Sequence, residues 1–383
     1  MLKILTAVSV LVAIFLSCKK STPENNAGEP AGFSNIFEVF WNQMNVRYSY
    51  WDADTVDWDR VYKQYKPLFD TLDINKEADN RQAYHYFLEM TTPFLDGHFS
   101  ITFSNRFLSN FIIYPSYQKK QHEGFFPVNY LTADTAYLDD NYTIGYDERT
   151  IINGRPLYAI CGLIDGEIIY FSCNSFGLYN YYTSSQYNAI KPVLQHLFDW
   201  LHNPAIKGII IDVRNNPGGD VKDLNLLAGH LTLTNHIFGF ARYKTGNDRL
   251  NFTPWLESFI NPVPNTTDFK KAKVVLTDRY SASLSELMAM AIRSLPNSTI
   301  VGDTTWGATG FITNGELYNA GSFEVKDFMK VTLSSGTFKY IDNRLYEGVG
   351  FPPDVQISSN TGTPNIVNDK TLEKAINIIK SNP

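Results

Sequence analysis

Cysteine is scarce in this chain: of 383 residues, only Cys18, Cys161 and Cys173 carry a thiol. So few cysteines exclude the disulfide framework that stabilises small secreted domains, and the fold must depend on hydrophobic cores. Cys161 and Cys173 could still pair with each other in an oxidising compartment. The roughly 350 residues beyond the N-terminal region are enough for two or three domains with cores of their own.

Basic residues form no block after Lys20, and the net charge is −6. Proteins that bind nucleic acid usually carry a basic patch or stripe, so this composition disfavours nucleic acid as a partner. The histidines lack the H-x-x-x-H and Cys-His spacings of metal sites, and we expect neither a metal nor another cofactor. Aromatic residues, in contrast, make up 14% of the sequence, which would suit either a large core or a binding face for sugars or peptides.

An apolar run at residues 4–16 follows the short basic start Met1-Leu2-Lys3. It is shorter than the about 20 residues needed to span a bilayer, and it fits a secretory signal. Cys18, directly after Leu16-Ser17, resembles the bacterial lipobox cysteine that becomes the lipidated N-terminus, with Phe15 where leucine is commoner. The alternative is an ordinary signal peptide with an incidental cysteine.

We therefore expect a lipoprotein signal peptide at residues 1–18 and a flexible tether at residues 19–32, which are polar and rich in Pro, Asn and Gly. A lipid on Cys18 would hold the protein to a bacterial membrane in the cell envelope, outside the cytoplasm, with the outer membrane favoured.

Apolar residues recur at three-to-four-residue spacing over three stretches between residues 33 and 97, which predicts helices. The stripes are Phe33, Ile36, Phe37, Phe40 and Met44; Val61, Tyr62, Tyr65, Leu68 and Phe69; and Ala83, Tyr84, Tyr86, Phe87 and Met90. Asp57 is a suitable N-cap for the second helix, and Pro93 ends the third. We expect an N-terminal helical domain over residues 33–97.

Strands and helices alternate in the second half of the chain. Residues 208–213 (GIIIDV) form a continuous apolar run, typical of a strand buried on both faces, and a turn and a helix follow. The same order recurs at residues 273–295, which predicts βαβ units, a covered sheet and a site beyond the C-terminal strand ends. Residues 157–171 read as a hairpin around Asp165-Gly166. The expected fold is α/β: the helical domain, a small β-rich segment at 98–165 and a β-α core at 166–383.

Ser283 lies within residues 279–286 (RYSASLSE), between an apolar strand and an amphipathic helix. Backbone N–H groups at a helix start are unpaired and the helix dipole favours negative charge there, which suits a nucleophile and the donors for its oxyanion. The alternative is structural, because Ser283-x-x-Glu286 before an apolar run is also a capping box.

Three other segments carry groups that could serve the same chemistry. Gly218-Gly219 follows the strand at 208–213, and its glycines could turn backbone N–H groups toward a substrate or simply form a turn. His98 lies at the junction of the helical and sheet-rich parts, where it could be a base or a structural histidine. Glu347, in residues 346–354 (YEGVGFPPD), could belong to the site or be solvated.

Together these segments resemble the S41 serine peptidases, which comprise the C-terminal processing (tail-specific) proteases and the tricorn-like proteases. Residues 208–219 resemble the family's D-x-R-x-N-x-G-G strand and turn, and residues 281–286 resemble its S-A-S-x-S-E turn, whose middle serine attacks. Residues 301–307 resemble its G-E-x-T-x-G run, with Asp303 for Glu. The resemblance implies a crotonase/ClpP-like core and a serine endopeptidase that forms an acyl-enzyme with peptide or unfolded-protein substrates.

One departure bears on the mechanism. Tail-specific proteases place a lysine base 25 residues after the serine, but that position is Ala308 here, and no lysine occurs between Lys273 and Lys326. The tricorn-like branch uses a histidine base and a distant glutamate, and the spacing of Glu347 to Gly350 and Pro353-Asp354 matches that glutamate's segment.

The resemblance therefore implies Ser283 as nucleophile and His98 as base, with Glu347 holding the imidazolium. The amides of Gly218 or Gly219, and of Leu284, would hold the oxyanion. The tricorn protease has a serine directly before this histidine that links it to the glutamate, and here the position is Gly97. Asp96, Ser100 or a direct contact with Glu347 could orient the ring instead.

Tail-specific relatives carry a peptide-binding PDZ domain between their helical part and core. Residues 98–165 occupy that place without a clear Gly-Leu-Gly-like loop, so we expect a reduced or divergent module. Two alternatives to a peptidase remain. One is a binding protein for an apolar, glycan or peptide ligand on this scaffold, since the fold also resembles retinoid-binding modules and crotonases. The other is an esterase that uses the same serine.

Overall fold

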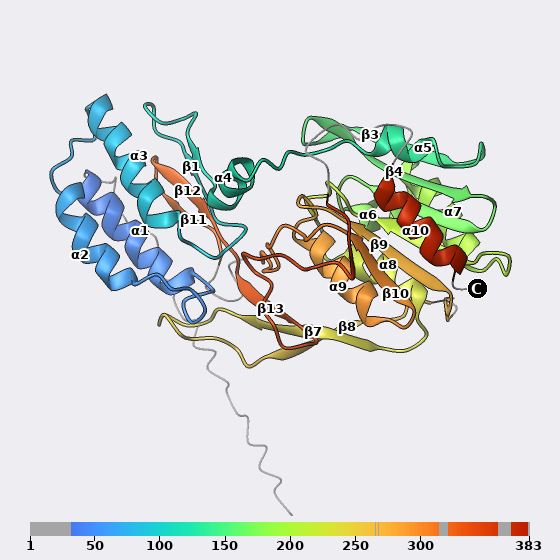
Figure 1. Ribbon diagram of the computed structural model, residues 1–383. Helices are drawn as coiled ribbons and strands as arrows, with labels where there is room; N and C mark the ends of the chain where they lie inside the picture. The colour runs from blue at the N-terminus through green and yellow to red at the C-terminus, as the bar shows by residue number, and fades with distance from the viewer. Residues whose placement is uncertain (1–31, 265, 267, 314–320, 359–368, 382–383) are drawn as a thin grey trace, which may run out of the picture.

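The computed structural model describes residues 32–264, 266, 268–313, 321–358 and 369–381, and it consists of an N-terminal lobe and a larger core (Figure 1). The predicted signal peptide, Cys18 and nearly all of the tether lie outside the described residues. Among the described helices, none has the length and apolar character to cross a membrane.

The helices are α1 (Phe33–Arg47), α2 (Trp58–Phe69), α3 (Glu77–Thr91), α4 (Pro115–His122), α5 (Leu131–Thr135), α6 (Leu178–Thr183), α7 (Ile190–Leu201), α8 (Lys222–Ala228), α9 (Leu284–Ser294) and α10 (Lys370–Ser381). The strands are β1 (Ser100–Phe103), β2 (Ile112–Ile113), β3 (Thr143–Ile152), β4 (Arg155–Ile164), β5 (Ile168–Cys173), β6 (Gly208–Asp212), β7 (His236–Tyr243), β8 (Leu256–Ile260), β9 (Ala272–Thr277), β10 (Ser298–Gly302), β11 (Phe323–Val325), β12 (Met329–Thr332), β13 (Gly336–Tyr340) and β14 (Val355–Gln356).

The N-terminal lobe contains the three predicted helices. The apolar stripe of α1 is buried, and Asp57 caps α2 by accepting a hydrogen bond from the amide of Arg60 at 3.0 Å. The aromatic side chains of the helices fill one common core, in which Phe37 stacks on Phe69 with ring centroids 4.9 Å apart. Much of the aromatic content therefore lies in this core.

A four-stranded sheet of order β11-β12-β1-β2 completes the lobe. Its strand β12 comes from far along the chain and pairs antiparallel with β1, with Ser100 opposite Thr332. Phe323, Phe328 and Met329 pack into the core of the helices. The predicted boundary at residue 166 is therefore wrong in one respect: residues 323–333 return from the core to the N-terminal lobe, because the helices alone leave an apolar face uncovered.

The core is built on a seven-stranded sheet of order β14-β10-β9-β6-β5-β4-β3, in which β5, β6, β9, β10 and β14 run parallel. Ile209 and Ile211 of β6 pack with α7, α8 and α9 on one face, and Ile210 packs with α10 on the other. The strand is buried on both faces, as its unbroken apolar run predicts. The predicted hairpin at Asp165-Gly166 is confirmed, since β4 and β5 pair antiparallel across it.

The predicted β-rich segment at 98–165 forms no separate module within the described residues. Its strands β1 and β2 belong to the sheet of the N-terminal lobe, whereas β3 and β4 extend the core sheet. The expectation of a reduced PDZ-like domain is therefore wrong, because each pair of strands finds its hydrogen-bonding partners in a neighbouring sheet. Cys161 and Cys173 are both free thiols on β4 and β5.

A third sheet, of order β13-β7-β8, runs beneath both lobes (Figure 1). Arg242 of β7 pairs with Asp52 of the N-terminal lobe at 2.6 Å, and Arg249 in the β7–β8 connection pairs with Asp59 of α2 at 2.6 Å. These contacts join the core to the lobe that precedes it in the chain.

Candidate active site

Ser283 follows β9 and precedes α9, in a turn with unusual backbone geometry. Its φ of 56° and ψ of −119° lie in a region that residues with a Cβ rarely adopt. Such strain costs about 1–3 kcal/mol and occurs mostly at functional sites. A serine on a sharp, strained turn between strand and helix is also the arrangement that exposes the nucleophile in α/β-hydrolases.

The serines on either side of Ser283 are structural. The hydroxyl of Ser281 donates to the carbonyl of Val213 at 2.8 Å, and the hydroxyl of Ser285 donates to the carbonyl of Asn216 at 2.8 Å. Both acceptors belong to the segment after β6, which neighbours β9 in the sheet. These two bonds fix the turn against the glycine turn, so Ser283 is the serine of the motif that remains for chemistry.

Glu286 anchors the same turn from within the protein. Its buried carboxylate accepts hydrogen bonds from the amide of Ser283 at 3.0 Å and from the amides of Gly307 and Ala308 at 2.7 Å. The hydroxyl of Thr305 adds a fourth bond at 2.6 Å. The predicted capping contact is present, and it serves to hold the strained turn against the loop at residues 305–308.

The glycine turn after β6 lies against the nucleophile. A Cβ on Gly218 would lie 2.7 Å from the Cβ of Ser283 and 2.7 Å from the amide nitrogen of Leu284, so only glycine permits this approach. The amide of Gly218, however, donates to Oδ1 of Asn216 at 2.9 Å. Gly218 therefore serves as a spacer rather than a free donor. Gly219 and Leu284 remain as the predicted donors, and Leu284 begins α9, where an amide has no acceptor within the helix.

His98 stands just before β1, in the N-terminal lobe. Its amide donates to Oδ1 of Asp96 at 2.9 Å, and its ring Nδ1 lies 3.2 Å from the hydroxyl of Ser334. That hydroxyl donates its proton to Oδ1 of Asp96 at 2.8 Å, and the amide of Ser334 donates to Oδ2 at 2.7 Å. Because the Ser334 proton points to Asp96, its oxygen must accept from Nδ1–H, which leaves Nε2 of His98 as the nitrogen with a free lone pair.

Burial lowers the pKa of His98 below its usual value of 6.5, and the nearby charge of Asp96 partly offsets the decrease. The ring is therefore neutral at neutral pH, which is the protonation state that a general base requires.

Gly97 is a glycine for steric reasons. A Cβ at this position would lie 2.4 Å from the carbonyl oxygen of Gly307 and 2.7 Å from the Cβ of Ala308. No serine can therefore stand before His98, and the hydroxyl that orients the ring comes from Ser334 instead. Ala308, where the tail-specific proteases have lysine, packs directly against this histidine segment.

Glu347 reaches the histidine segment through its backbone. Its carboxylate accepts hydrogen bonds from the amide of Gly97 at 2.7 Å, the amide of Gly310 at 2.8 Å and the hydroxyl of Thr309 at 2.9 Å. Among the described residues, the carboxylate that is joined to the ring through a hydrogen-bonded hydroxyl is Asp96, by way of Ser334. That Glu347 holds the imidazolium stays a prediction. Burial, and then the charge of Asp96, raise the pKa of Glu347 to about 8.

The ligand atoms of Asp96, His98 and Glu347 lie within 4.8 Å of one another, a spacing that a metal could bridge. Each carboxylate, however, is already surrounded by backbone amides and hydroxyl groups that donate to it. The arrangement is that of a hydrogen-bond network which positions the imidazole.

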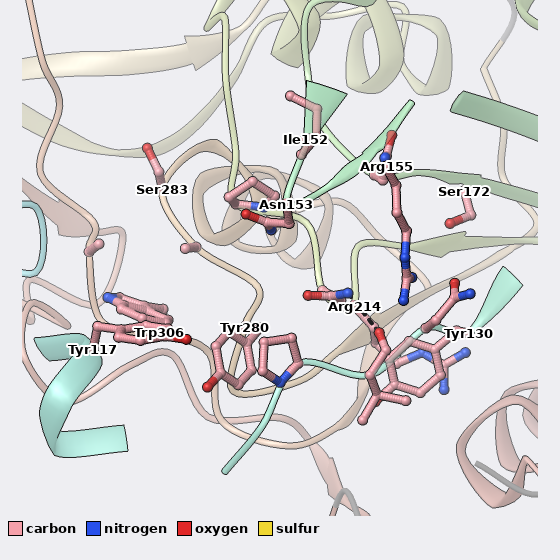
Figure 2. Close-up of a pocket in the computed structure, with 18 of the residues that line it drawn as sticks. Tyr117, Tyr130, Ile152, Asn153, Arg155, Ser172, Arg214, Tyr280, Ser283 and Trp306 are labelled. Atoms are coloured by element: carbon pink, nitrogen blue, oxygen red, sulfur yellow. Dashed lines mark hydrogen bonds between the residues drawn. The ribbon is translucent and has the colours of Figure 1, made fainter. Parts of the chain in front are cut away.

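Ser283 and His98 line one cavity of about 550 Å3 between the two lobes. Figure 2 shows Ser283 at one side of this cavity, above Tyr117 and Trp306, with Tyr280 beside them. Arg155, Ser172 and Tyr130 lie at the other side. The cavity therefore extends well beyond Ser283. The side chains of Tyr117, Tyr280 and Trp306 form an aromatic wall close to this residue.

Sequence reasoning did not find Ser334 or the aromatic wall. Ser334 belongs to a plain Leu-Ser-Ser-Gly stretch between β12 and β13 and carries no motif. Its role arises only because β12 pairs with β1 and brings it beside His98.

Two family profiles match parts of this chain. Residues 169–357 match the profile of peptidase family S41, and residues 30–80 match the tricorn protease C1 domain. The chain is therefore similar to peptidase family S41 over residues 169–357 and to the tricorn C1 domain over residues 30–80.

The curated relatives are distant. A carboxy-terminal processing protease of Bacillus subtilis (strain 168) is 29% identical over 107 residues, which are 28% of this chain and 20% of that protein. The nisin-resistance protein of Lactococcus lactis subsp. lactis is 23% identical over 163 residues, which are 42% of this chain and 49% of that protein. The chain thus spans half or less of the length of these relatives.

Solved structures share the fold over nearly the whole chain. A crystal structure of a candidate peptidase from Parabacteroides merdae ATCC 43184 superposes with a TM-score of 0.68 at 23% identity, covering 91% of this chain and 97% of that one. A lipoprotein from Streptococcus agalactiae superposes with a TM-score of 0.50 at 16% identity, covering 94% of this chain and 100% of that one.

Proposed function

We propose that this protein is a serine endopeptidase in which Ser283 is the nucleophile and His98 the general base. The observation that carries the proposal is the strained backbone of Ser283 at the start of α9, in a residue that lines the same cavity as His98, whose Nδ1 is held by Ser334. Strain at an otherwise unremarkable serine has a cost, which a purely structural cap would not require.

Nε2 of His98 takes the proton of the Ser283 hydroxyl as the oxygen attacks a peptide carbonyl carbon. The amides of Leu284 and Gly219 donate to the oxyanion of the tetrahedral intermediate, and one such donor is typically worth about 3 kcal/mol. When the intermediate collapses, the carbon–nitrogen bond breaks and His98 returns the proton to the leaving amine. Water then hydrolyses the acyl-enzyme by the same route.

Three acidic residues support this chemistry without contacting the substrate. Asp96 stabilises the imidazolium through the Ser334 hydroxyl, which takes the place of the serine that the tricorn protease has before its histidine. Glu347 holds the backbone at Gly97 against residues 309–310, and Glu286 holds the nucleophile turn. All three are positioning residues.

The test is labelling with a fluorophosphonate probe, which reacts with activated serines. We expect stoichiometric labelling of the native chain, complete loss in Ser283→Ala, and a labelling rate lower by at least about 100-fold in His98→Ala. Ser281→Thr offers a matched control, because it keeps the hydroxyl at the neighbouring structural position. A folded wild-type protein that stays unlabelled would overturn the peptidase proposal and favour a binding protein on this scaffold.

We also propose that Cys18 carries a lipid that anchors the protein to the membrane, by its resemblance to the lipobox. Growth of the producing bacterium with a radiolabelled fatty acid should label the wild-type protein and leave Cys18→Ser unlabelled. Equal labelling of the two would refute the anchor.

A further inference from the structure

The charged residues that line the cavity containing Ser283 differ in sign from the net charge of the chain. The chain has a net charge of −6, yet no aspartate or glutamate is found among the described residues that line the cavity. Its charged side chains are Arg155 and Arg214, and the remaining lining is aromatic, aliphatic or neutral polar. A cavity lined in this way favours an anionic group over a cationic one.

Arg214 does not supply free charge to this cavity. It is buried and pairs with Asp212, with Asp369 at 2.7 Å and with Asp134 at 3.2 Å. Its guanidinium also lies 3.9 Å from the centre of the Tyr130 ring. These contacts join the C-terminal segment to the sheet, and they neutralise the arginine.

Arg155 differs from Arg214 in its exposure and in its ion pairing. It begins β4, directly after the tight turn at Asn153-Gly154, and it is exposed. Within the described part of the chain, no carboxylate pairs with it. By contrast, Arg149 on the same hairpin pairs with Asp147 at 3.0 Å. Figure 2 shows the Arg155 side chain extending from the hairpin into the cavity, toward Tyr130.

We propose that Arg155 binds a carboxylate of the substrate and so determines which peptides the cavity accepts. This inference rests on the proposed peptidase function and adds a specificity residue to it. The planar guanidinium can donate two parallel hydrogen bonds to a carboxylate, a pairing that is stronger and more directional than a lysine contact. Because Arg155 lies at the far side of the cavity from Ser283, the carboxylate belongs to a residue away from the scissile bond.

Two sources could provide such a group: the side chain of an aspartate or glutamate, or the C-terminal carboxylate of the peptide. Both present the same planar anion to Arg155. They differ in what removes them, since a Glu-to-Gln change removes the first and amidation of the C-terminus removes the second.

The experiment uses eight-residue alanine–leucine peptides that carry one Glu or one Gln at each position in turn, each with a free or an amidated C-terminus. We expect kcat/KM to be at least about tenfold higher for the carboxylate member of one matched pair, the usual size of a charge-assisted hydrogen bond. The preference should disappear in Arg155→Met, be partly retained in Arg155→Lys and persist in the control Arg149→Met. It should also weaken as salt is raised.

Fluorescence anisotropy with the same peptides and the Ser283→Ala chain gives the preference as a ratio of Kd values, without any turnover. Fluorophosphonate labelling of the control Arg149→Met should match the wild type. Equal kcat/KM values and equal Kd values for all acidic and neutral pairs, or a preference that survives Arg155→Met, would overturn the role of Arg155 and leave the peptidase proposal standing. If the probe does not label the wild-type protein, the peptidase proposal is overturned, and the ratio of Kd values still decides the role of Arg155.

Discussion

Ser283 and His98 show how single residues acquire function from their surroundings. The serine is held in a backbone conformation with φ of 56°, stabilised by bonds from its amide to Glu286 and from its flanking serines to the segment after β6. The histidine is held in one tautomer by Ser334. Neither group is unusual by residue type, and both are distinguished by the hydrogen bonds around them.

The pH dependence of activity follows from the burial of His98. Because burial lowers the pKa of this residue below 6.5, its neutral, active form persists to a lower pH than in an exposed histidine. We expect kcat/KM to stay above half of its plateau at pH 6.5 and to fall only as the pH decreases further. A pH profile of kcat/KM on one peptide tests this.

A decline centred above pH 6.5 would contradict the prediction. Asp96→Asn provides a directional check. Because the charge of Asp96 raises the pKa of His98, its removal should move the acidic midpoint to still lower pH. The same midpoint in both proteins would mean that another group controls the profile.

At the scale of elements, the site is assembled from segments that no local signal joins. Strand β12 carries Ser334 to His98 because it pairs with β1, and neighbouring strands β6 and β9 bring the glycine turn to the nucleophile turn. The sheet edge where parallel strands end is where such loops meet. The position of each functional group therefore depends on strand pairing.

Ser334→Ala tests whether catalysis depends on the hydroxyl that the pairing of β12 with β1 brings beside His98. Loss of the hydroxyl leaves Nδ1 of His98 without its partner, so the ring should lose its preferred tautomer and orientation. We expect kcat to fall by about 10- to 100-fold with little change in KM, and the rate of fluorophosphonate labelling to fall in parallel.

The control for this prediction is Ser100→Ala, which removes a hydroxyl two residues from His98 that sequence alone could equally have assigned to the ring. Ser334→Thr should recover part of the lost rate, since it restores an oxygen at this place. Equal rates in Ser334→Ala and the wild type would show that the ring is oriented in another way.

At the scale of the whole molecule, the proposed base and nucleophile belong to different lobes. His98 is attached to the N-terminal lobe and Ser283 to the core, so the relative position of the two lobes determines how the two groups meet. The β7–β8 hairpin spans the lobes (Figure 1) and carries Arg242 and Arg249, which pair with Asp52 and Asp59.

We expect the double variant Arg242→Met/Arg249→Met to lose activity out of proportion to its stability. Partly exposed ion pairs are each worth at most about 1 kcal/mol, so Tm should change little. A displacement of the catalytic groups by about 1 Å can cost about 100-fold in rate, so kcat should fall by at least about tenfold. Steady-state kinetics and thermal unfolding of the same preparations measure the two effects.

Lys380→Met is the matched control, since it removes an exposed ion pair with Asp165. Both partners of this pair belong to the larger lobe, so it does not join the two lobes. The substitution should lower neither Tm nor kcat appreciably. An unchanged kcat in the double variant would show that other contacts fix the lobes.

Periodicity determined the local elements of this protein. The three N-terminal helices, the buried strand β6, the hairpin of β4 and β5, and the strand-to-helix turn at Ser283 all follow from short-range patterns, because burial on one face or both faces imposes a spacing on apolar residues. The motifs in the second half of the chain also predicted a resemblance to peptidase family S41, whose profile matches residues 169–357.

Tertiary structure alone decided which distant groups meet. The return of β11 and β12 to the N-terminal lobe, the hydroxyl of Ser334 beside His98, the engagement of the Gly218 amide by Asn216 and the unpaired Arg155 in the cavity each depend on strand pairing or on a neighbour that is far away in the chain. The sequence specifies these contacts only through the sum of all its packing interactions, so no local pattern reveals them.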